Sequence, residues 1–216
     1  MGITTLNRYG SRATPSAVLW VTPNLTAAHA MSSVKDVLRH EALNRRAALT
    51  EEERAQKSDA AIRHLLQMPV FQTAGTVAIY LPLKTELAID ALLKASTQLT
   101  QRFVAPRTLA DNQMSFHEVT VNSTLERGFG NIMEPAMNSP VVRSEDIDLF
   151  LVPLAACDQR GNRLGFGGGF YDRALVNQRG FKLGVGFTVQ LVEHIEREAH
   201  DVTLDGFISE DGATYF

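Results

Sequence analysis

The sequence contains a single cysteine, Cys157, and no long hydrophobic run. One cysteine can form neither an internal disulfide nor a site of several thiolates, which fits a reducing compartment. The longest apolar run, Leu149 to Cys157, has nine residues and is interrupted by Pro153. A membrane-spanning helix needs roughly 18 or more apolar residues. We therefore expect no membrane partner.

Neither sign of charge dominates, since the chain has 21 basic and 24 acidic residues and a net charge of −3. This balance gives no general electrostatic reason to bind nucleic acid, so any anion site has to be local. The chain is 44% apolar and 21% charged over 216 residues, values typical of a soluble globular protein with a real core.

Acidic residues are absent from the first 30 residues, which carry two arginines. We expect residues 1–30 to be a flexible N-terminal extension ahead of one α/β domain over residues 31–216. An acid-poor segment is typical of a mitochondrial transit peptide, but two prolines weaken the helix that such a peptide needs. A disordered extension, or a natural start at Met31, is the alternative. We predict a cytoplasmic location, with the mitochondrion as the alternative.

Helical and strand patterns alternate along the rest of the chain. Helices are expected from residue 33, over 50–67, over 87–96 and from 170, and strands over 76–81, 102–105, 114–119, 148–152 and 182–187. Residues 122–144 are rich in turn formers and are expected to be mostly loop. This order predicts a single three-layer, Rossmann-like α/β domain with a largely parallel sheet flanked by helices. Ligands of such sheets bind beyond the carboxyl ends of the strands, here after Leu81 and Pro153.

The densest chemical signal lies between a buried strand and a helix, over residues 158–173. Four glycines fall within five positions there: Gly165, Gly167, Gly168 and Gly169. Glycines let backbone N–H groups approach a ligand, and the start of the following helix favours an anion. The segment therefore predicts a phosphate-binding site. Arg163 can add charge, and Asp172 can hold a Mg²⁺ ion that bridges phosphate oxygens. The segment fits neither the dinucleotide fingerprint nor Walker A, and a turn required only for packing is the alternative.

The stretch from Asp148 to Arg173 closely resembles the signature of the 5-formyltetrahydrofolate cyclo-ligase family, also called 5,10-methenyltetrahydrofolate synthetases. The segment Lys35-Asp-Val-Leu-Arg39 is similar to the family's amino-terminal Lys-x-x-Leu-Arg. Further matches are Arg45-Arg46, Leu49-Thr50, Glu86, Glu134-Pro135, Gln190-Leu-Val-Glu193 and Asp205. The resemblance covers about residues 33 to 210.

The resemblance implies an enzyme that uses ATP and Mg²⁺ to close 5-formyltetrahydrofolate into 5,10-methenyltetrahydrofolate, with release of ADP and phosphate. In the mechanism proposed for the family, the formyl oxygen takes the γ-phosphoryl group, N10 then attacks the activated carbon, and phosphate leaves. Such a reaction depends on positioning and charge neutralisation more than on a protein nucleophile. The sequence accordingly shows no Ser-His-Asp or Cys-His signature.

Carried over residue by residue, the resemblance implies contacts to ATP, folate and metal. The implied ATP contacts are Lys35, Arg39, Arg163, Leu164, Gly165, Phe166, Gly167, Gly168, Gly169, Phe170 and Tyr171. Among these, Arg163, Lys35 and Tyr171 are expected to be catalytic. The implied folate contacts are Leu81 and Glu86, and the implied Mg²⁺ ligands are Asp172 and Asp205.

Without the resemblance, several of these residues have plainer interpretations. Exposed helix cations such as Lys35 and Arg39 are usually solvated, and an aspartate at a helix start usually caps the helix. The chain also departs from the family after Glu86, where Leu-Ala-Ile replaces the common Val-Asp-Thr. Phe166 and Gly168 stand where some members carry basic residues.

Two other functions remain open on the sequence alone. An enzyme of the phosphosugar isomerase or CoA-transferase type on a similar sheet would turn over without ATP. A non-catalytic folate-binding regulator would bind 5-formyltetrahydrofolate without turnover. We expect 5-formyltetrahydrofolate and ATP as partners, no nucleic acid, and a monomer or weak dimer.

Overall fold

The computed structural model describes residues 34–216, so the extension expected at residues 1–30 lies outside the described residues. The α-helices are α1 (Val34–Ala48), α2 (Glu51–Gln67), α3 (Pro69–Thr73), α4 (Asp90–Lys94) and α5 (Phe170–Leu175). The main sheet contains β1 (Thr76–Ala78), β2 (Arg102–Thr108), β3 (Met114–Glu118), β6 (Val141–Val142), β7 (Leu149–Pro153), β10 (Phe181–Val185), β12 (Gly206–Ser209) and β13 (Gly212–Tyr215). Two small sheets contain β4 (Leu125–Arg127) with β5 (Met133–Pro135), and β8 (Ala156–Asp158) with β9 (Arg163–Leu164) and β11 (Leu191–Val192). Short 3₁₀ helices span Ala110–Asn112, Phe129–Asn131, Ser144–Asp146 and Thr188–Gln190.

The main sheet is largely parallel, as the sequence predicts. Its strand order is β13-β12-β10-β7-β1-β2-β3-β6, and the strands from β12 to β2 in that order run parallel. The chain leaves β1 for β2 on one side and later fills β7, β10 and β12 on the other side. The switch point therefore lies between β1 and β7, where a crevice opens at the carboxyl ends of parallel strands.

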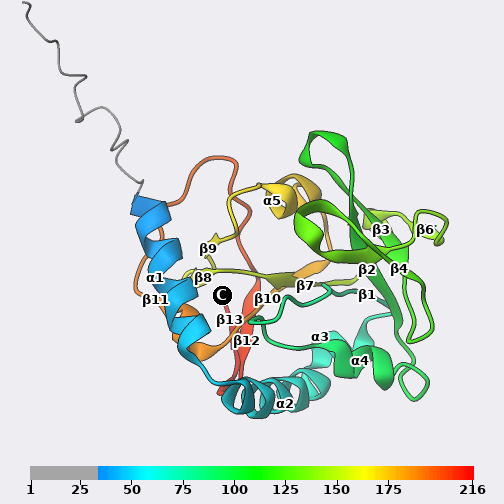
Figure 1. Cartoon of the computed structure of the whole chain (residues 1–216), viewed down its shortest axis with the longest axis horizontal. Coiled ribbons are helices and arrows are strands. Elements are labelled where there is room, and N and C mark those ends of the chain that lie inside the picture. Colours follow the sequence, from blue (N-terminus) through cyan, green and yellow to red (C-terminus); the bar gives the residue numbers. More distant parts are fainter. Residues whose placement is uncertain (1–33) are drawn as a thin grey trace, which may run out of the picture. The chain divides into compact units, whose positions relative to one another are not determined.

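Helices cover both faces of this sheet (Figure 1), with α2, α3 and α4 on one face and α5 on the other. Strand β7 shows why its sequence is a continuous apolar run. Leu149 and Leu151 pack into the core shared with α2 to α4, whereas Phe150 and Val152 pack into the core that includes Leu175 of α5. Because successive side chains point to opposite faces, a strand covered on both sides must be apolar throughout. The three-layer α/β fold is thereby confirmed.

Helix α2 begins where the sequence predicts a capping box. The Glu53 backbone N–H donates to Thr50 Oγ1 at 3.2 Å, and the Thr50 backbone N–H donates to Glu53 Oε2 at 2.7 Å. These reciprocal bonds satisfy two backbone groups that a helix start leaves without partners. They fix the turn between α1 and α2.

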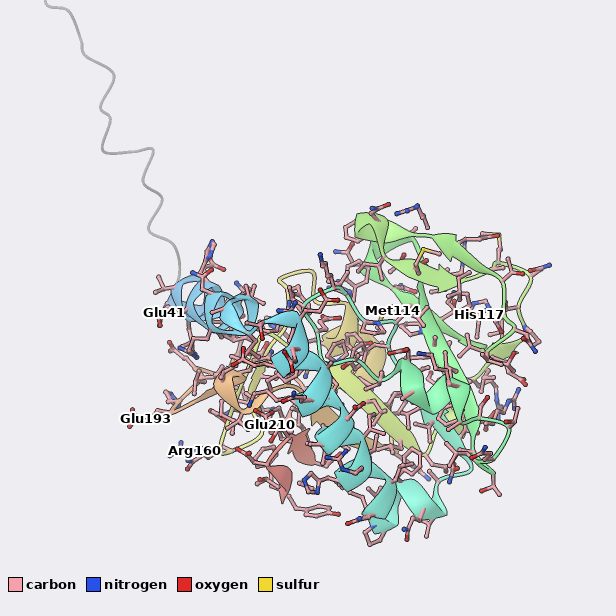
Figure 2. All side chains as sticks on the ribbon, turned by 60° about the horizontal axis from the view of Figure 1, so that its bottom comes forward. Glu41, Met114, His117, Arg160, Glu193 and Glu210 are labelled. Carbon is pink, nitrogen blue, oxygen red and sulfur yellow. The ribbon has the colours of Figure 1, made fainter. Side chains whose placement is uncertain are left out.

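Helix α1 packs on the sheet formed by β8, β9 and β11. Ala42 of α1 is fully buried against Ala155, Ala156, Leu164 and Ile195. Figure 2 shows Glu41 of α1 on the same side of the molecule as Arg160 and Glu193, with Met114 and His117 of β3 on the other side. Helix α1 is therefore brought beside the segment that follows β7.

The structure differs from the sequence expectation in several regions. The strand expected over 76–81 ends at Ala78, the helix expected over 87–96 spans only Asp90–Lys94, and the segment after β7 contains β8 and β9. Residues 122–144, expected to be mostly loop, contain β4, β5 and β6, and two further strands, β12 and β13, follow the strand expected over 182–187. All three residues of β4 are exposed, so they carry no alternating pattern, and β6 has only two residues. Among residues 34–216, no helix is both long and apolar enough to cross a membrane.

Candidate active site

Two cavities lie beside residues 163–169, here called the glycine-rich loop. The larger cavity has a volume of about 880 Å³, and the smaller cavity has a volume of about 310 Å³. Both are lined by Gly168, Gly169 and Asp172. Two ligands, one in each cavity, would therefore meet at this common wall.

The larger cavity is polar and carries charge of both signs. Its ionisable lining residues are Asp172, Arg173, Lys182, Arg197, His200, Asp201 and Asp205. Gly167 lines this cavity as well, and so do residues of the segment before β12, such as Val202 and Thr203. A polar cavity with several cations beside a glycine-rich loop suits a polyanion.

The smaller cavity lies at the carboxyl ends of β1, β2 and β7, where the sheet rule places a ligand. Its apolar walls include Pro106, Met114, Phe129, Ile132, Met133, Phe166 and Phe170. A few polar groups converge on it, namely Tyr80, Glu86, Thr108, Glu134, Arg163 and Tyr171. An apolar pocket with few convergent polar groups is typical of a site for a flat organic molecule.

Backbone conformation explains two of the loop's glycines. Gly167 has φ +96°, and Gly169, which directly precedes α5, has φ +64°. Residues with a Cβ avoid this left-handed region, at a cost of roughly 1 kcal/mol or more. Glycine at these two positions lets the chain turn sharply into α5.

Helix α1 holds the glycine-rich loop through two arginines. Arg39 Nε donates to the carbonyl oxygen of Gly165 at 2.8 Å. The guanidinium carbon of Arg46 lies 5.5 Å from the centre of the Phe166 ring, which is a cation–π contact. Two consecutive loop residues are thus fixed from the same helix.

Lys35, at the start of α1, binds two acids of the segment before β12. Its Nζ lies 2.7 Å from Asp201 Oδ2 and 3.0 Å from Glu198 Oε1. Burial alone would lower the pKa of Lys35, but the hydrogen bonds to Asp201 and Glu198 outweigh burial and raise its pKa. The ammonium is therefore charged beside Asp201, which lines the larger cavity.

Arg163 and Asp172 form an ion pair at the common wall. Arg163 Nη2 lies 2.7 Å from Asp172 Oδ1, and Arg163 Nη1 donates to the carbonyl oxygen of Val202. The Val202 N–H also donates to Asp172 Oδ1 at 3.2 Å. Asp205, the other expected metal ligand, accepts the Lys182 backbone N–H at 2.7 Å through Oδ2. Both aspartates line the larger cavity.

Glu86 is buried at the edge of the smaller cavity with Arg46 beside it. Glu86 Oε2 accepts the Leu83 N–H at 2.8 Å, and Glu86 Oε1 lies 3.7 Å from Arg46 Nη1. Burial raises the pKa of Glu86, while the Leu83 hydrogen bond and Arg46 oppose that shift. Burial also lowers the pKa of Arg46, against the opposing effect of Glu86. Each charge thus limits the desolvation cost of the other.

The two tyrosines of the smaller cavity stay protonated over the physiological range. Burial, followed by the negative charge of Glu86, raises the pKa of both Tyr80 and Tyr171. The Tyr80 hydroxyl donates to the carbonyl oxygen of Leu87 at 2.6 Å. A protonated Tyr171 can donate a hydrogen bond but cannot act as a base.

Most of the site residues expected from the sequence line one of the two cavities, and three do not. Lys35 and Arg39 reach the site only through Asp201 and Gly165, as described above. Leu164 is buried under α1, and its carbonyl oxygen accepts the Ala155 N–H at 2.7 Å. Although Leu164 belongs to the glycine-rich loop, its side chain is therefore part of the core.

The sequence does not identify several of the lining residues as site residues. The cations Arg173, Lys182 and Arg197 line the larger cavity. Thr108 lines the smaller one, together with Glu134, which the resemblance includes but to which it assigns no role. Thr108 ends β2, so the strand-end rule points to it, and Arg173 directly follows Asp172 in the stretch that resembles the family. Lys182 and Arg197 come from separate segments that only the fold brings together.

The profile of the 5-formyltetrahydrofolate cyclo-ligase family matches residues 31–210. The chain belongs to this family. The expectation of a cyclo-ligase family enzyme is thereby confirmed. The Escherichia coli K12 protein named 5-formyltetrahydrofolate cyclo-ligase is 30% identical over 171 residues, covering 76% of this chain and 94% of the relative.

Solved structures of cyclo-ligase family proteins share the fold. The NMR structure of Aquifex aeolicus 5,10-methenyltetrahydrofolate synthetase has a TM-score of 0.75 and 34% identity, covering 84% of this chain and 92% of that chain. A 5,10-methenyltetrahydrofolate synthetase from Mycoplasma pneumoniae is similar in fold alone, with a TM-score of 0.67 and 24% identity over 82% of this chain and 99% of that chain.

Proposed function

We propose that this protein closes 5-formyltetrahydrofolate to 5,10-methenyltetrahydrofolate with ATP and Mg²⁺, releasing ADP and phosphate. The observation that carries the proposal is the common wall of the two cavities. A polar cavity suited to a triphosphate and an apolar cavity suited to a pterin share Gly168, Gly169 and Asp172. The names of the cyclo-ligase relatives supply the substrate.

The reaction proposed at this wall has two steps. The formyl oxygen attacks the γ-phosphorus of ATP, the bond from that phosphorus to the ADP oxygen breaks, and ADP leaves. The folate N10 then attacks the formyl carbon, the carbon–oxygen bond breaks, and phosphate leaves with the former formyl oxygen. N10 loses its proton, and the new ring is 5,10-methenyltetrahydrofolate. Both steps need aligned reactants and neutralised oxygens more than a protein nucleophile.

The protein's own groups would supply the alignment and the charge. Backbone N–H groups of the glycine-rich loop would bind the phosphates, and Arg163 would neutralise charge at the common wall. Lys35 would add a positive charge from α1 beside Asp201. Tyr171 would donate a hydrogen bond within the smaller cavity, and Leu81 and Glu86 would contact the folate there.

Asp172 and Asp205 have the chemistry of Mg²⁺ ligands. Carboxylate oxygens are hard donors, and both residues line the larger cavity. Among residues 34–216, no group of three or more histidine, cysteine, aspartate or glutamate side chains could hold a metal ion. Two carboxylates leave positions for water and phosphate oxygens, which is how Mg²⁺ usually binds with a nucleotide. When bound, Mg²⁺ supplies neutralising charge to the phosphates.

Absorbance spectroscopy tests the proposal directly. Purified protein mixed with 5-formyltetrahydrofolate and Mg-ATP should produce the near-ultraviolet band of methenyltetrahydrofolate, and omission of ATP or addition of EDTA should abolish it. Binding of the folate without this band would identify a folate-binding protein instead. Turnover without ATP would instead support an isomerase or transferase.

A further inference from the structure

A second buried carboxylate, Glu134 of β5, lies in the smaller cavity with no positive charge beside it. Only 3% of Glu134 is exposed. Thr108 Oγ1 donates to Glu134 Oε1 at 2.6 Å. Within residues 34–216, no basic nitrogen comes within 4.0 Å of this carboxylate. One neutral donor does not offset the desolvation free energy of a buried, ionised carboxylate. Further hydrogen-bond donors, such as those of a ligand, would offset more of it.

Gly128, across the β4–β5 hairpin, makes room for this carboxylate. A Cβ on Gly128 would lie 2.0 Å from Glu134 Cδ and 2.2 Å from Glu134 Oε2. The φ of Gly128 is −106°, so the backbone itself does not require glycine. The absence of a side chain at this position therefore serves the placement of Glu134.

Glu134 differs from Glu86, the other carboxylate of the smaller cavity. Glu86 already accepts the Leu83 N–H and lies beside Arg46. Glu134 has its one bond from Thr108, which lies at the carboxyl end of β2 and orients the group from that side. Of the two carboxylates, Glu134 has more free acceptor capacity for a ligand.

We propose that Glu134 determines specificity by accepting two hydrogen bonds from the 2-amino-4-oxopyrimidine edge of a reduced pterin. This inference rests on the proposed function and names how its folate is recognised. That edge presents N3–H and the 2-amino group side by side, a donor pair that matches the two oxygens of a carboxylate. Hydrogen bonds to a carboxylate are about twice as strong as those between neutral groups. Apolar neighbours such as Met114 and Phe129 line the same cavity and suit the flat ring.

The test compares Glu134→Gln with Glu126→Gln, a matched control. Glu126 lies directly opposite Glu134 in the hairpin, but its half-exposed carboxylate binds Arg107 at 3.1 Å. The E134Q variant should bind 5-formyltetrahydrofolate about 10- to 100-fold more weakly, because an amide presents an N–H where the pterin needs an acceptor. E126Q should bind like the unaltered protein, and ATP affinity should be unchanged in both variants.

A pterin analogue without its 2-amino group separates recognition from a structural role. The penalty of E134Q should be about tenfold smaller with this analogue, because one of the two hydrogen-bond donors is already missing. An equal penalty with both ligands, or no penalty with either, would overturn the inference. Thermal melting and ATP binding of E134Q show whether the variant is folded.

Gly128→Ala is a second variant that leaves Glu134 in place. Its added methyl group should displace the carboxylate and weaken folate binding in the same direction as E134Q. Turnover by the unaltered protein is measured first, since its failure would refute the proposed function. Normal turnover together with unchanged folate affinity in E134Q and G128A would refute only the inference about Glu134.

Discussion

At the scale of single residues, Asp158 shows how hydrogen bonds hold a buried carboxylate in this fold, with His194 Nδ1 3.9 Å from its Oδ2. Its Oδ1 accepts the backbone N–H groups of Arg160 and Asn162, at 2.9 Å and 3.0 Å. Its Oδ2 accepts Asn162 Nδ2 and the Ile195 N–H, at 2.9 Å and 3.0 Å. Burial would raise the pKa of Asp158, but these four hydrogen bonds together outweigh burial and lower the pKa. The residue ties the β8–β9 turn to the segment after β11.

Asp158→Asn should therefore destabilise the fold in a pH-dependent way. Because the pKa of Asp158 is lower in the folded state, its stabilising effect is complete above the unfolded value of about 3.9 and is lost as pH falls through the folded value. We expect the variant to lose about 1–3 kcal/mol in free energy of unfolding at pH 7, and less near pH 3. Urea unfolding at the two pH values measures this difference.

Glu41→Gln, which replaces an exposed acid of α1, serves as the control and should change stability little at either pH. An equal loss at pH 7 and pH 3 for Asp158→Asn would mean that the side chain contributes by shape and neutral hydrogen bonding rather than by charge.

At the scale of elements, helix α1 contacts the glycine-rich loop. The sequence places Lys35 and Arg39 one turn apart, and the structure shows Arg39 bound to Gly165 of that loop. Arg45, on the same helix, donates instead to the carbonyl oxygen of Val189 at 2.8 Å. The helix thus offers a matched pair of arginines, one on the loop and one away from it.

Arg39→Ala should loosen the glycine-rich loop before any ligand is bound. We expect faster amide hydrogen exchange in residues 163–169 of the nucleotide-free protein and about a 5- to 10-fold rise in the KM for ATP, because a hydrogen bond from a charged donor to the loop is lost. Arg45→Ala should leave both quantities unchanged. Unaltered exchange in the Arg39 variant would show that the contact does not order the loop.

Elements with strong local signals were predictable, and those built by tertiary contacts were not. The capping box at Thr50 and the apolar run of β7 give signals within a few residues, and both elements form where expected. Strands β4 and β12 give no such local signal. All three residues of β4 are exposed, and β12 begins at a glycine and ends at a serine. Their pairing depends on neighbours that are distant in sequence, and local sequence propensity does not predict this dependence.

At the scale of the whole molecule, the switch point between β1 and β7 explains why the site forms where it does. The sequence could indicate the strand ends after Leu81 and Pro153 and the glycine-rich loop between β7 and α5. It could not place Lys182 across the larger cavity or Glu134 in the smaller one. These residues become neighbours of the loop only through the order of strands in the sheet and the fold of the β4–β5 hairpin.

The proposed reaction depends on one event at the common wall of the two cavities, the transfer of the γ-phosphoryl group to the formyl oxygen. Isotope tracing tests it most directly. 5-Formyltetrahydrofolate labelled with oxygen-18 in its formyl group is turned over with unlabelled Mg-ATP in unlabelled water, and the released phosphate is analysed by mass spectrometry. We predict that the phosphate carries the labelled oxygen. Phosphate without the label would contradict this reaction, because its fourth oxygen would then come from water and ATP would be hydrolysed without activating the formyl group.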